Sequence, residues 1–434
     1  MVEILPFKGF TYNKQKFEDF DDLMSPPYDI ISEKMQKELY EKNPLNFVRL
    51  ILGAQKPGDN ETENKYTRAK KYLTKWIDDL VLVKSDNPAI YPYKVEYKIN
   101  SKIKTFNGFF VLLKLDPDYK LVRAHERTLS KPKEDRLNLM RACNSNLEPI
   151  QLLYIDKNDK IRNLIDSALN EPFIKVKGYD GFNHKLWKLE DENLLSKIQK
   201  DLKEKILFIA DGHHRYQTAI NYANELKNKS GNTNENAPFN YRMVILANIF
   251  DEGLSILPTH RLIKKSDINI EKILEKLKEF FIIEEKIVNV KNYKYNEISN
   301  EIKKQLETKT EHKFAMYLKG IYYLLTLKDE KIMDNFAKDK SKVWRTLDVS
   351  ILHNIILEYL MNINQDNLED HVKYTRVDEE AVSFVEESKF DLSFLMNATK
   401  IDQLKAVAEA GEHMPQKSTY FLPKMLSGLV FYKM

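Results

Sequence analysis

The chain has 434 residues, and 69 lysines and arginines against 65 aspartates and glutamates give it a formal charge of +4. Hydrophobic residues make up 42% and aromatic residues 11% of the sequence, which is enough for folded cores and excludes a wholly disordered chain. The single cysteine excludes an internal disulfide and a thiolate metal site, and no apolar run reaches the ~18 residues of a membrane-spanning helix. We therefore expect a globular, cytoplasmic protein without a membrane partner.

In the first third of the sequence, short strand-like segments alternate with helical ones. The β-rich run 46–53 predicts a strand, and apolar residues at helical spacing predict a helix over 63–80. Two aromatic, β-branched runs, 89–100 and 102–116, predict the two strands of a hairpin.

Strands and helices continue to alternate through the remainder of the chain. Strands are predicted over 149–155, 206–210, 243–249 and 391–396, and helices over 192–205, 216–228 and 403–410. The lysine-rich stretch 267–329 has a helix–strand–helix–hairpin pattern. Because strands separated by helices are typical of mixed α/β proteins, we expect a mixed α/β (α+β) fold.

The pattern divides the chain into four regions. They are an N-terminal α/β region over 1–120, a core over 121–266, a lysine-rich helix and strand subdomain over 267–345, and a C-terminal α/β region over 346–434 that returns to the core.

The densest group of polar residues follows the predicted strand 206–210. It consists of Asp211, Gly212, His213, His214 and Arg215 and opens a predicted helix. Free amides at a helix start favour a phosphate, an arginine can add a bidentate contact, and a carboxylate suits Mg²⁺ or a proton transfer. The alternative is an ordinary helix start with the aspartate as its cap. A zinc site is not expected, because neighbouring histidines diverge on a helix.

A second polar segment, 123–136, contains His125, Glu126 and Arg127. His125 and Glu126 are candidate acceptors for the proton of a substrate hydroxyl, and Arg127 is a candidate for binding substrate. A salt-bridged surface loop explains the segment equally well.

Three further irregular segments contribute candidates; the alternative is a plain helix-entry turn for the first and a plain structural loop for each of the other two. They supply Tyr28 and Asp29 after two prolines, His260 and Arg261 at the predicted end of a strand, and Lys417, Ser418 and Thr419 after Met414 and Pro415. The last segment lacks the glycines of a P-loop.

Six motifs, in this order along the chain, resemble a bacterial and archaeal family known as domain of unknown function one-zero-one-five. They are Pro26–Asp29, Asn46–Leu50, His125–Thr128, Asp211–Tyr216, Leu257–Arg261 and Met414–Thr419. The segment from Asp211 to Arg215 also resembles the phosphate-binding motif of the ParB and sulfiredoxin superfamily, which includes free-serine kinases.

This resemblance implies a ParB/sulfiredoxin-like nucleotide-binding core with large additional helix–strand regions. It implies a small-molecule kinase that uses ATP or ADP with Mg²⁺ and converts L-serine, or a similar alcohol, to its phosphate ester. The implied nucleotide-binding residues are Gly212, His213, His214, Arg215, Lys417, Ser418 and Thr419. The implied catalytic residues are Glu126, His125 and Asp211, the substrate-binding residues are Arg127, Tyr28, His260 and Arg261, and the metal ligands are Asp211 or Asp29.

Two other classes of protein stay open. One is a ParB-like nucleotide switch acting with DNA or a protein partner, although balanced, interspersed charge argues against a nucleic-acid partner. The other is a non-catalytic partner protein whose motifs are structural. The sequence does not indicate the oligomeric state.

Overall fold

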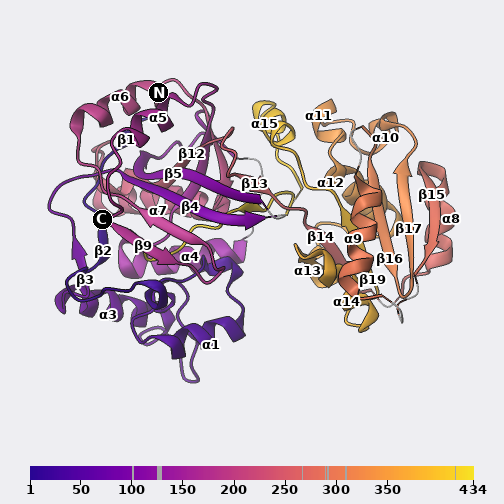
Figure 1. Ribbon diagram of the computed structural model, residues 1–434, viewed down its shortest axis with the longest axis horizontal. Coiled ribbons are helices and arrows are strands. Elements are labelled where there is room, and N and C mark those ends of the chain that lie inside the picture. The colour runs from indigo at the N-terminus through magenta and orange to yellow at the C-terminus, as the bar shows by residue number, and fades with distance from the viewer. Residues whose placement is uncertain are drawn as a thin grey trace. The chain divides into compact units, whose positions relative to one another are not determined.

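The computed structural model describes residues 1–99, 102–124, 130–265, 267–288, 290, 293–307, 310–415 and 417–434 (Figure 1). Within them the chain forms two compact units. The first unit comprises residues 1–124, 130–255 and 423–434, and the second comprises Ile256–Leu422. Each unit has its own main sheet.

The first unit is built on a nine-stranded mixed sheet with the strand order β6-β11-β8-β12-β5-β4-β10-β9, and β1 adds to β5. Its strands are β1 (Ile4–Leu5), β4 (Tyr91–Ile99), β5 (Lys102–Lys114), β6 (Val122–Arg123), β8 (Ile150–Tyr154), β9 (Ile174–Lys177), β10 (Asn183–Leu186), β11 (Leu207–Asp211) and β12 (Tyr241–Asn248). The pairs β6–β11 and β8–β12 are parallel, and the other pairs are antiparallel.

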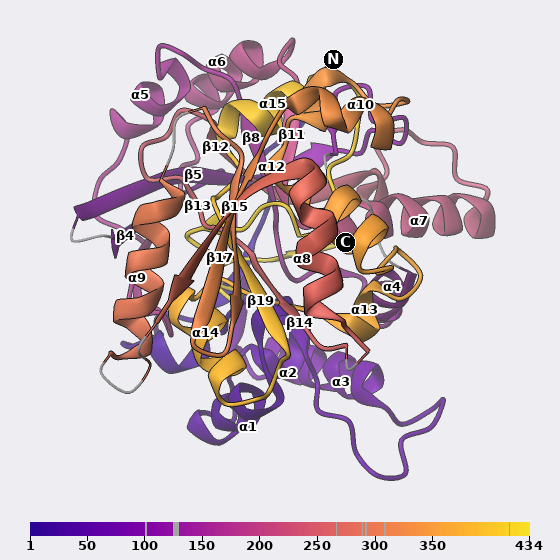
Figure 2. The same cartoon turned by 90° about the vertical axis from the view of Figure 1, so that its right-hand side faces the viewer.

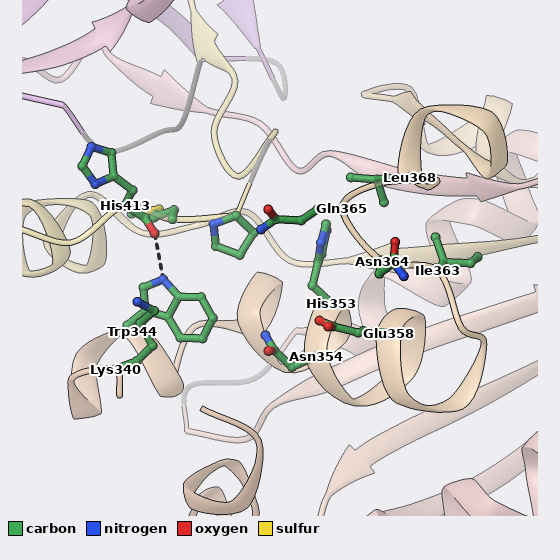
Figure 3. A pocket seen from close by; sticks show the side chains of 12 residues that line it. Lys340, Trp344, His353, Asn354, Glu358, Ile363, Asn364, Gln365, Leu368 and His413 are labelled. Carbon is green, nitrogen blue, oxygen red and sulfur yellow. Dashed lines mark hydrogen bonds between the residues drawn. The ribbon is translucent and has the colours of Figure 1, made fainter. Parts of the chain in front are cut away.

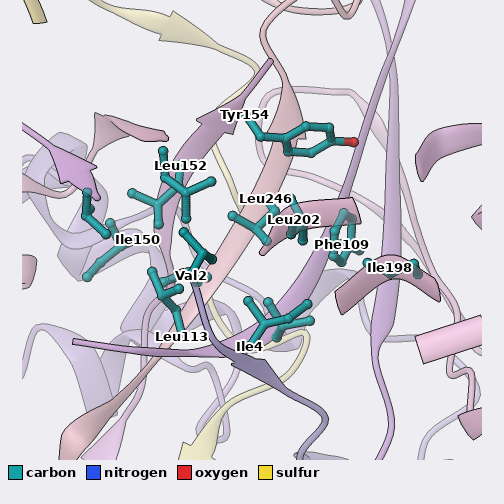
Figure 4. Packing of buried hydrophobic residues seen from close by; sticks show 14 of the residues in the cluster. Val2, Ile4, Phe109, Leu113, Ile150, Leu152, Tyr154, Ile198, Leu202 and Leu246 are labelled. Carbon is teal, nitrogen blue, oxygen red and sulfur yellow. The ribbon is translucent and has the colours of Figure 1, made fainter. Parts of the chain in front are cut away.

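Alternate residues of the central strands build the main hydrophobic core of this unit (Figure 4). Phe109, Leu152 and Leu246 lie on the core face, because strand side chains alternate between the two faces of a sheet. Helices α5 (Lys160–Asp166) and α6 (Glu192–Leu202) add side chains such as Ile198, which is completely buried. Truncation of one such side chain to alanine costs about 2–5 kcal/mol.

The other elements of the first unit are short strands and helices outside this sheet. They are β2 (Phe10–Tyr12), η1 (Asp21–Leu23), η2 (Tyr28–Ile30), α1 (Glu33–Lys42), α2 (Val48–Ile51), α3 (Lys65–Asp78), β3 (Leu82–Lys84), α4 (Ser130–Cys143), β7 (Ser145–Asn146), α7 (His213–Ser230), η3 (Pro238–Asn240) and β21 (Tyr432–Lys433). Helix α3 starts at Asn64 with a reciprocal capping box to Thr67, which satisfies amide groups that the helix itself leaves unpaired.

The second unit has a six-stranded antiparallel sheet with the order β15-β17-β16-β19-β14-β18. Its strands are β14 (His260–Ile263), β15 (Phe281–Ile287), β16 (Lys313–Leu318), β17 (Ile321–Leu327), β18 (Val372–Thr375) and β19 (Leu392–Met396). Figure 2 shows α9 (Tyr295–Leu306) and α14 (Asp378–Glu386) on one face and α8 (Ile270–Phe280) on the other. Ile302 of α9 and Val382 of α14 pack with Tyr317 of β16 in a second core.

Shorter elements complete the second unit. They are η4 (Glu330–Ile332), α10 (Met333–Phe336), α11 (Lys342–Arg345), α12 (Asp348–Ile351), the π-helical segment η5 (Leu352–Leu360), α13 (Leu368–His371) and α15 (Ile401–Glu409). Strands β13 (Ser255–Ile256) and β20 (Phe421–Leu422) occur where the chain passes from one unit to the other.

The predicted mixed α/β fold is confirmed, as are the hairpin of β4 and β5, helix α3, and the helix–strand–helix–hairpin order of α8, β15, α9, β16 and β17. The turn of the first hairpin lies outside the described residues. The ParB/sulfiredoxin-like core and the division into four regions stay predictions. No helix in the described part of the chain is long and apolar enough to cross a membrane.

The predicted strand over 46–53 is wrong, because this segment contains the short helix α2. Asn46 is fully buried, and its side chain donates to the carbonyl groups of Asp22 and Met24 and accepts from the Val48 amide. These contacts fix a helical turn whose apolar residues are buried on all sides, so tertiary packing overrides the strand preference of the sequence. His260 and Arg261 begin β14 and do not end a strand.

Candidate anion-binding site

A buried strand, a single glycine and a long helix form the centre of the site. Strand β11 ends at Asp211, Gly212 has a φ of 94°, and the 18-residue helix α7 begins at His213. A Cβ atom at position 212 would lie 3.0 Å from Nε of Arg215, in a backbone region that disfavours any side chain. No side chain caps the start of α7, so its amide groups and the positive end of its dipole suit an anion.

Two cations hold the carboxylate of Asp211. Lys424 donates to Oδ1 and Arg215 donates to Oδ2. Burial alone would raise the pKa of Asp211, but the charges of Lys424 and Arg215 outweigh this effect and hold that pKa well below its ordinary value. Asp211 therefore stays ionised, is a poor proton acceptor near neutral pH, and has both oxygens engaged.

Arg215 is buried and is bonded within the protein. Its Nη1 atom donates to the Pro149 carbonyl oxygen at 2.5 Å, and its Nη2 atom donates to Asp211. The guanidinium group thus ties the first turn of α7 to β11 and to the start of β8. In this arrangement Arg215 positions the Gly212 turn and adds positive charge behind it.

A second group of charges surrounds Tyr28. The Arg136 guanidinium lies 3.9 Å from the centre of the Tyr28 ring and 3.4 Å from Glu148 Oε2, and the Tyr28 amide donates to Glu148 Oε1 at 3.0 Å. Burial raises the pKa of the Tyr28 phenol, on which the charges of Arg215 and Asp29 also act. Tyr28, Asp29 and Arg215 therefore share one neighbourhood, in which Asp29 is exposed.

The buried charges of this cluster do not balance. Four buried cations, Arg136, Arg215, Arg242 and Lys424, face two carboxylates, Glu148 and Asp211. Asp135 also bonds Arg136, but Lys65 matches its charge. The charge of the exposed Asp29 also acts on Arg215, so among the residues that the structure describes the cluster has a formal excess of one positive charge. Because buried charge is costly unless it is compensated, this excess favours a bound anion.

Arg242 is the residue of this cluster whose unpaired buried N–H groups most favour a bound anion. It is 3% exposed, and only its Nη2 atom is bonded, at 2.9 Å to the Glu148 carbonyl oxygen. Nε and Nη1 are buried and have no hydrogen-bond partner. Burial and the charge of Arg215 lower the pKa of Arg242 to about 9.

The residues predicted in the second unit form a separate group. Arg261 is completely buried, and its Nη2 atom donates to the Lys417 carbonyl oxygen at 3.3 Å. The Ser418 hydroxyl donates to Pro415, and His260 Nε2 lies 2.7 Å from Asp378 Oδ1.

Lys417 is exposed and Thr419 is half-buried. The structure thus brings Arg261 and the backbone of Lys417 together within the second unit. The predicted His125, Glu126 and Arg127 lie outside the described residues.

Four charged residues of the cluster were not among the residues predicted from the sequence: Arg136, Glu148, Arg242 and Lys424. Arg136 belongs to the polar run 123–136, and Glu148 stands directly before a predicted strand. Lys424 and Arg242 are each a single charge among apolar neighbours in the sequence. A charged residue in a buried segment usually has a charged or hydrogen-bonding partner, so this pattern could have identified both.

The structure thus defines a mixed α/β protein with an electropositive cluster at a helix start. The chain belongs to the family described as protein of unknown function (DUF1015), whose family model matches residues 4–350. No curated protein matches the chain significantly.

Several solved structures are similar to the chain at low TM-scores. A mutant free serine kinase in complex with ADP is 13% identical and has a TM-score of 0.37, covering 75% of this chain and 91% of its own. A conserved hypothetical protein from Pyrococcus furiosus is 16% identical, with a TM-score of 0.34 and coverage of 72% and 90%. C-terminally truncated SbnI from Staphylococcus aureus is 13% identical, with a TM-score of 0.34 and coverage of 73% and 85%. TM-scores this low do not indicate a function for the chain.

Proposed function

We propose that this protein is a small-molecule kinase that transfers a phosphoryl group from ATP or ADP to the hydroxyl group of a free amino acid, L-serine or a close analogue. The observation that carries the proposal is the uncapped start of α7 behind Gly212, beside a buried cluster with excess positive charge. A chain of phosphate groups is an anion that suits both features.

The nucleotide phosphates would bind the first amides of α7 together with His213 and His214, while Arg215 and Lys424 supply positive charge from behind. Phosphoryl transfer depends mainly on positioning and on neutralising charge, which this arrangement favours. In the transfer, the bond from phosphorus to its bridging oxygen breaks and a bond to the acceptor hydroxyl oxygen forms. The hydroxyl proton passes to Glu126 or His125.

Mg²⁺ would neutralise phosphate charge during this reaction. No cluster of three or more metal-binding side chains occurs in the described part of the chain. Asp211 does not fit as a ligand, because Lys424 and Arg215 engage both of its oxygens. The exposed Asp29 fits, since Mg²⁺ in kinases is commonly held by one or two carboxylates and by phosphate oxygens.

The other predicted residues complete the proposal. Arg127 and Tyr28 would contact the acceptor, whereas the roles implied for His260, Arg261, Lys417, Ser418 and Thr419 stay predictions. The choice of L-serine rests on the resemblance of the motif from Asp211 to Arg215 to that of free-serine kinases.

The test is to incubate the protein with Mg²⁺, ATP or ADP, and a mixture of L-serine, homoserine, threonine and inositol, and to follow the products by phosphorus NMR. We expect a new phosphomonoester signal that disappears when one acceptor is omitted. Glu126→Gln should abolish this signal and leave nucleotide binding unchanged. Hydrolysis without transfer, or an untouched nucleotide, would contradict the proposal and favour a nucleotide switch.

A further inference from the structure

The second unit contains a cavity of about 200 Å³ that is separate from the cluster around Gly212 (Figure 3). It is lined by residues at and before α11, by the π-helical segment η5, by the turn after η5 and by residues 413–415. A water molecule takes about 30 Å³ of liquid volume, so the space suits a molecule of roughly seven to ten non-hydrogen atoms.

The π-helical segment shapes one wall of this cavity. The Met361 amide donates to the Ile356 carbonyl oxygen, five residues earlier, at 3.0 Å. This hydrogen bonding widens the helix and brings residues five apart, here His353 and Glu358, to one side, where both line the cavity. Such π-helical turns are rare and frequently occur at functional sites.

His353 presents a neutral imidazole to the cavity. Arg261 Nη2 lies 3.4 Å from His353 Nε2, and because a guanidinium group only donates, Nε2 accepts and the ring proton is on Nδ1. Burial and the charge of Arg261 lower the pKa of His353 to about 3. The ring is therefore an uncharged hydrogen-bond donor at neutral pH.

Apolar side chains form much of the remaining wall. Trp344, Ile363, Leu368 and Met414 line the cavity, and each is less than a tenth exposed. The indole nitrogen of Trp344 donates to the His413 carbonyl oxygen at 2.8 Å, which fixes the ring at the edge of the space (Figure 3). This surface suits an apolar group of a ligand.

One side chain of each charge lines the cavity. Figure 3 shows Lys340 beside Trp344 on one side and Glu358 on the other, next to the polar side chain of Asn354. The Asn354 amide group donates to Ser350, which leaves its side-chain oxygen as an acceptor. Lys340 Nζ also lies 3.1 Å from Oδ2 of Asp339, which is exposed and does not line the cavity, so a ligand carboxylate would share Lys340 with it. A ligand with one positive and one negative group matches the charges of this lining.

We propose that this cavity binds a free α-amino acid with an apolar side chain, its carboxylate directed to Lys340 and its ammonium group to Glu358. The apolar side chain packs against Trp344 and the neighbouring aliphatic residues. Free leucine and free valine have the size and the charges that the cavity requires. The proposal concerns binding only and does not depend on the proposed kinase activity.

The test is calorimetric titration of the full chain, without nucleotide, with L-leucine, L-valine and the uncharged 4-methylpentanamide, which keeps the side chain of leucine and lacks its charged groups. We expect one of the free amino acids to bind and the uncharged analogue to bind at least about tenfold more weakly. Glu358→Gln and Lys340→Met should each weaken binding about tenfold or more, since each removes a charged hydrogen-bond partner.

Glu369→Gln and Lys342→Met are matched controls, because both residues are exposed in the same unit and neither lines the cavity. Thermal unfolding of the four variants checks that each is folded. Absence of binding by both free amino acids at millimolar concentration would overturn the proposal. Equal binding of the uncharged analogue, or an equal loss in the control variants, would do so too.

Discussion

The ammonium group of Lys424 donates a hydrogen bond to the Asp211 carboxylate, 213 residues earlier in the sequence. Lys424 is 6% exposed and lies in the C-terminal segment that belongs to the first compact unit. The end of the chain thus supplies one of the two cations that hold Asp211 at the start of α7. The family model matches residues 4–350 and so does not extend to Lys424.

Lys424→Met should destabilise the first unit, because it leaves a buried carboxylate with only one of its two cations. We expect a loss of about 1.5–3 kcal/mol in the free energy of unfolding, measured by urea denaturation, because Arg215 still compensates the charge of Asp211. Lys433→Met, at an exposed lysine nearby in the sequence, should change it by less than about 0.5 kcal/mol. Asp211→Asn should lower the free energy of unfolding further than Lys424→Met does, because it leaves both Lys424 and Arg215 without this counter-charge. Equal stability of the two lysine variants would refute a structural role for this ion pair.

Gly212→Ala should weaken nucleotide binding. The substitution costs about 1–2 kcal/mol at a positive φ, and its methyl group would meet Arg215 beside the proposed phosphate position. Gly231→Ala is a matched control, since Gly231 caps the end of the same helix with a φ of 63°, and a Cβ atom there would meet no other atom within 4 Å. We expect calorimetry with ADP to show a loss of about tenfold or more for Gly212→Ala alone. A similar loss in both variants would point to helix stability as the cause.

The Asp251 carboxyl should contribute more to the free energy of unfolding in mild acid than at neutral pH. Burial raises the pKa of Asp251 from 3.8 to about 6, although Asn107 and the Gly253 amide donate to it. Because the folded protein holds the proton of Asp251 more tightly than the unfolded chain does, this group stabilises the fold fully below pH ~4. The stabilisation is lost as the pH rises through ~6, a change of about 3 kcal/mol in the free energy of unfolding. Urea denaturation across this range should show the slope in the native protein and its loss in Asp251→Asn. Parallel curves for the two proteins would contradict the prediction.

His353 should have the opposite effect in the second unit. Its pKa is lowered from 6.5 to about 3, so below pH ~6.5 the unfolded chain takes up a proton that the folded chain does not. The contribution of His353 to stability is therefore complete above pH ~6.5 and decreases as the pH falls towards ~3. NMR of the imidazole should show no titration in the folded protein between pH ~5 and ~8, and a midpoint near 6.5 in urea. A midpoint near 6.5 in the folded protein would refute this prediction.

Local patterns allowed much of the fold to be predicted from the sequence. Helix α3, the hairpin of β4 and β5, and strand β11 followed by α7 depend on apolar spacing and turn residues within one segment. The Gly212 turn was found in the same way, because its neighbours in the site, Asp211 and Arg215, are also its neighbours in the sequence.

Only the tertiary structure decided the features that join distant segments. The sequence did not connect Lys424 with Asp211, or Arg136 and Arg242 with Glu148, because each pair is brought together by the packing of different elements. The helical turn in 46–53 also depends on such contacts. Local propensity determines which element a segment prefers, whereas the pairing of buried charges is set by long-range packing, which has no pattern within a single segment.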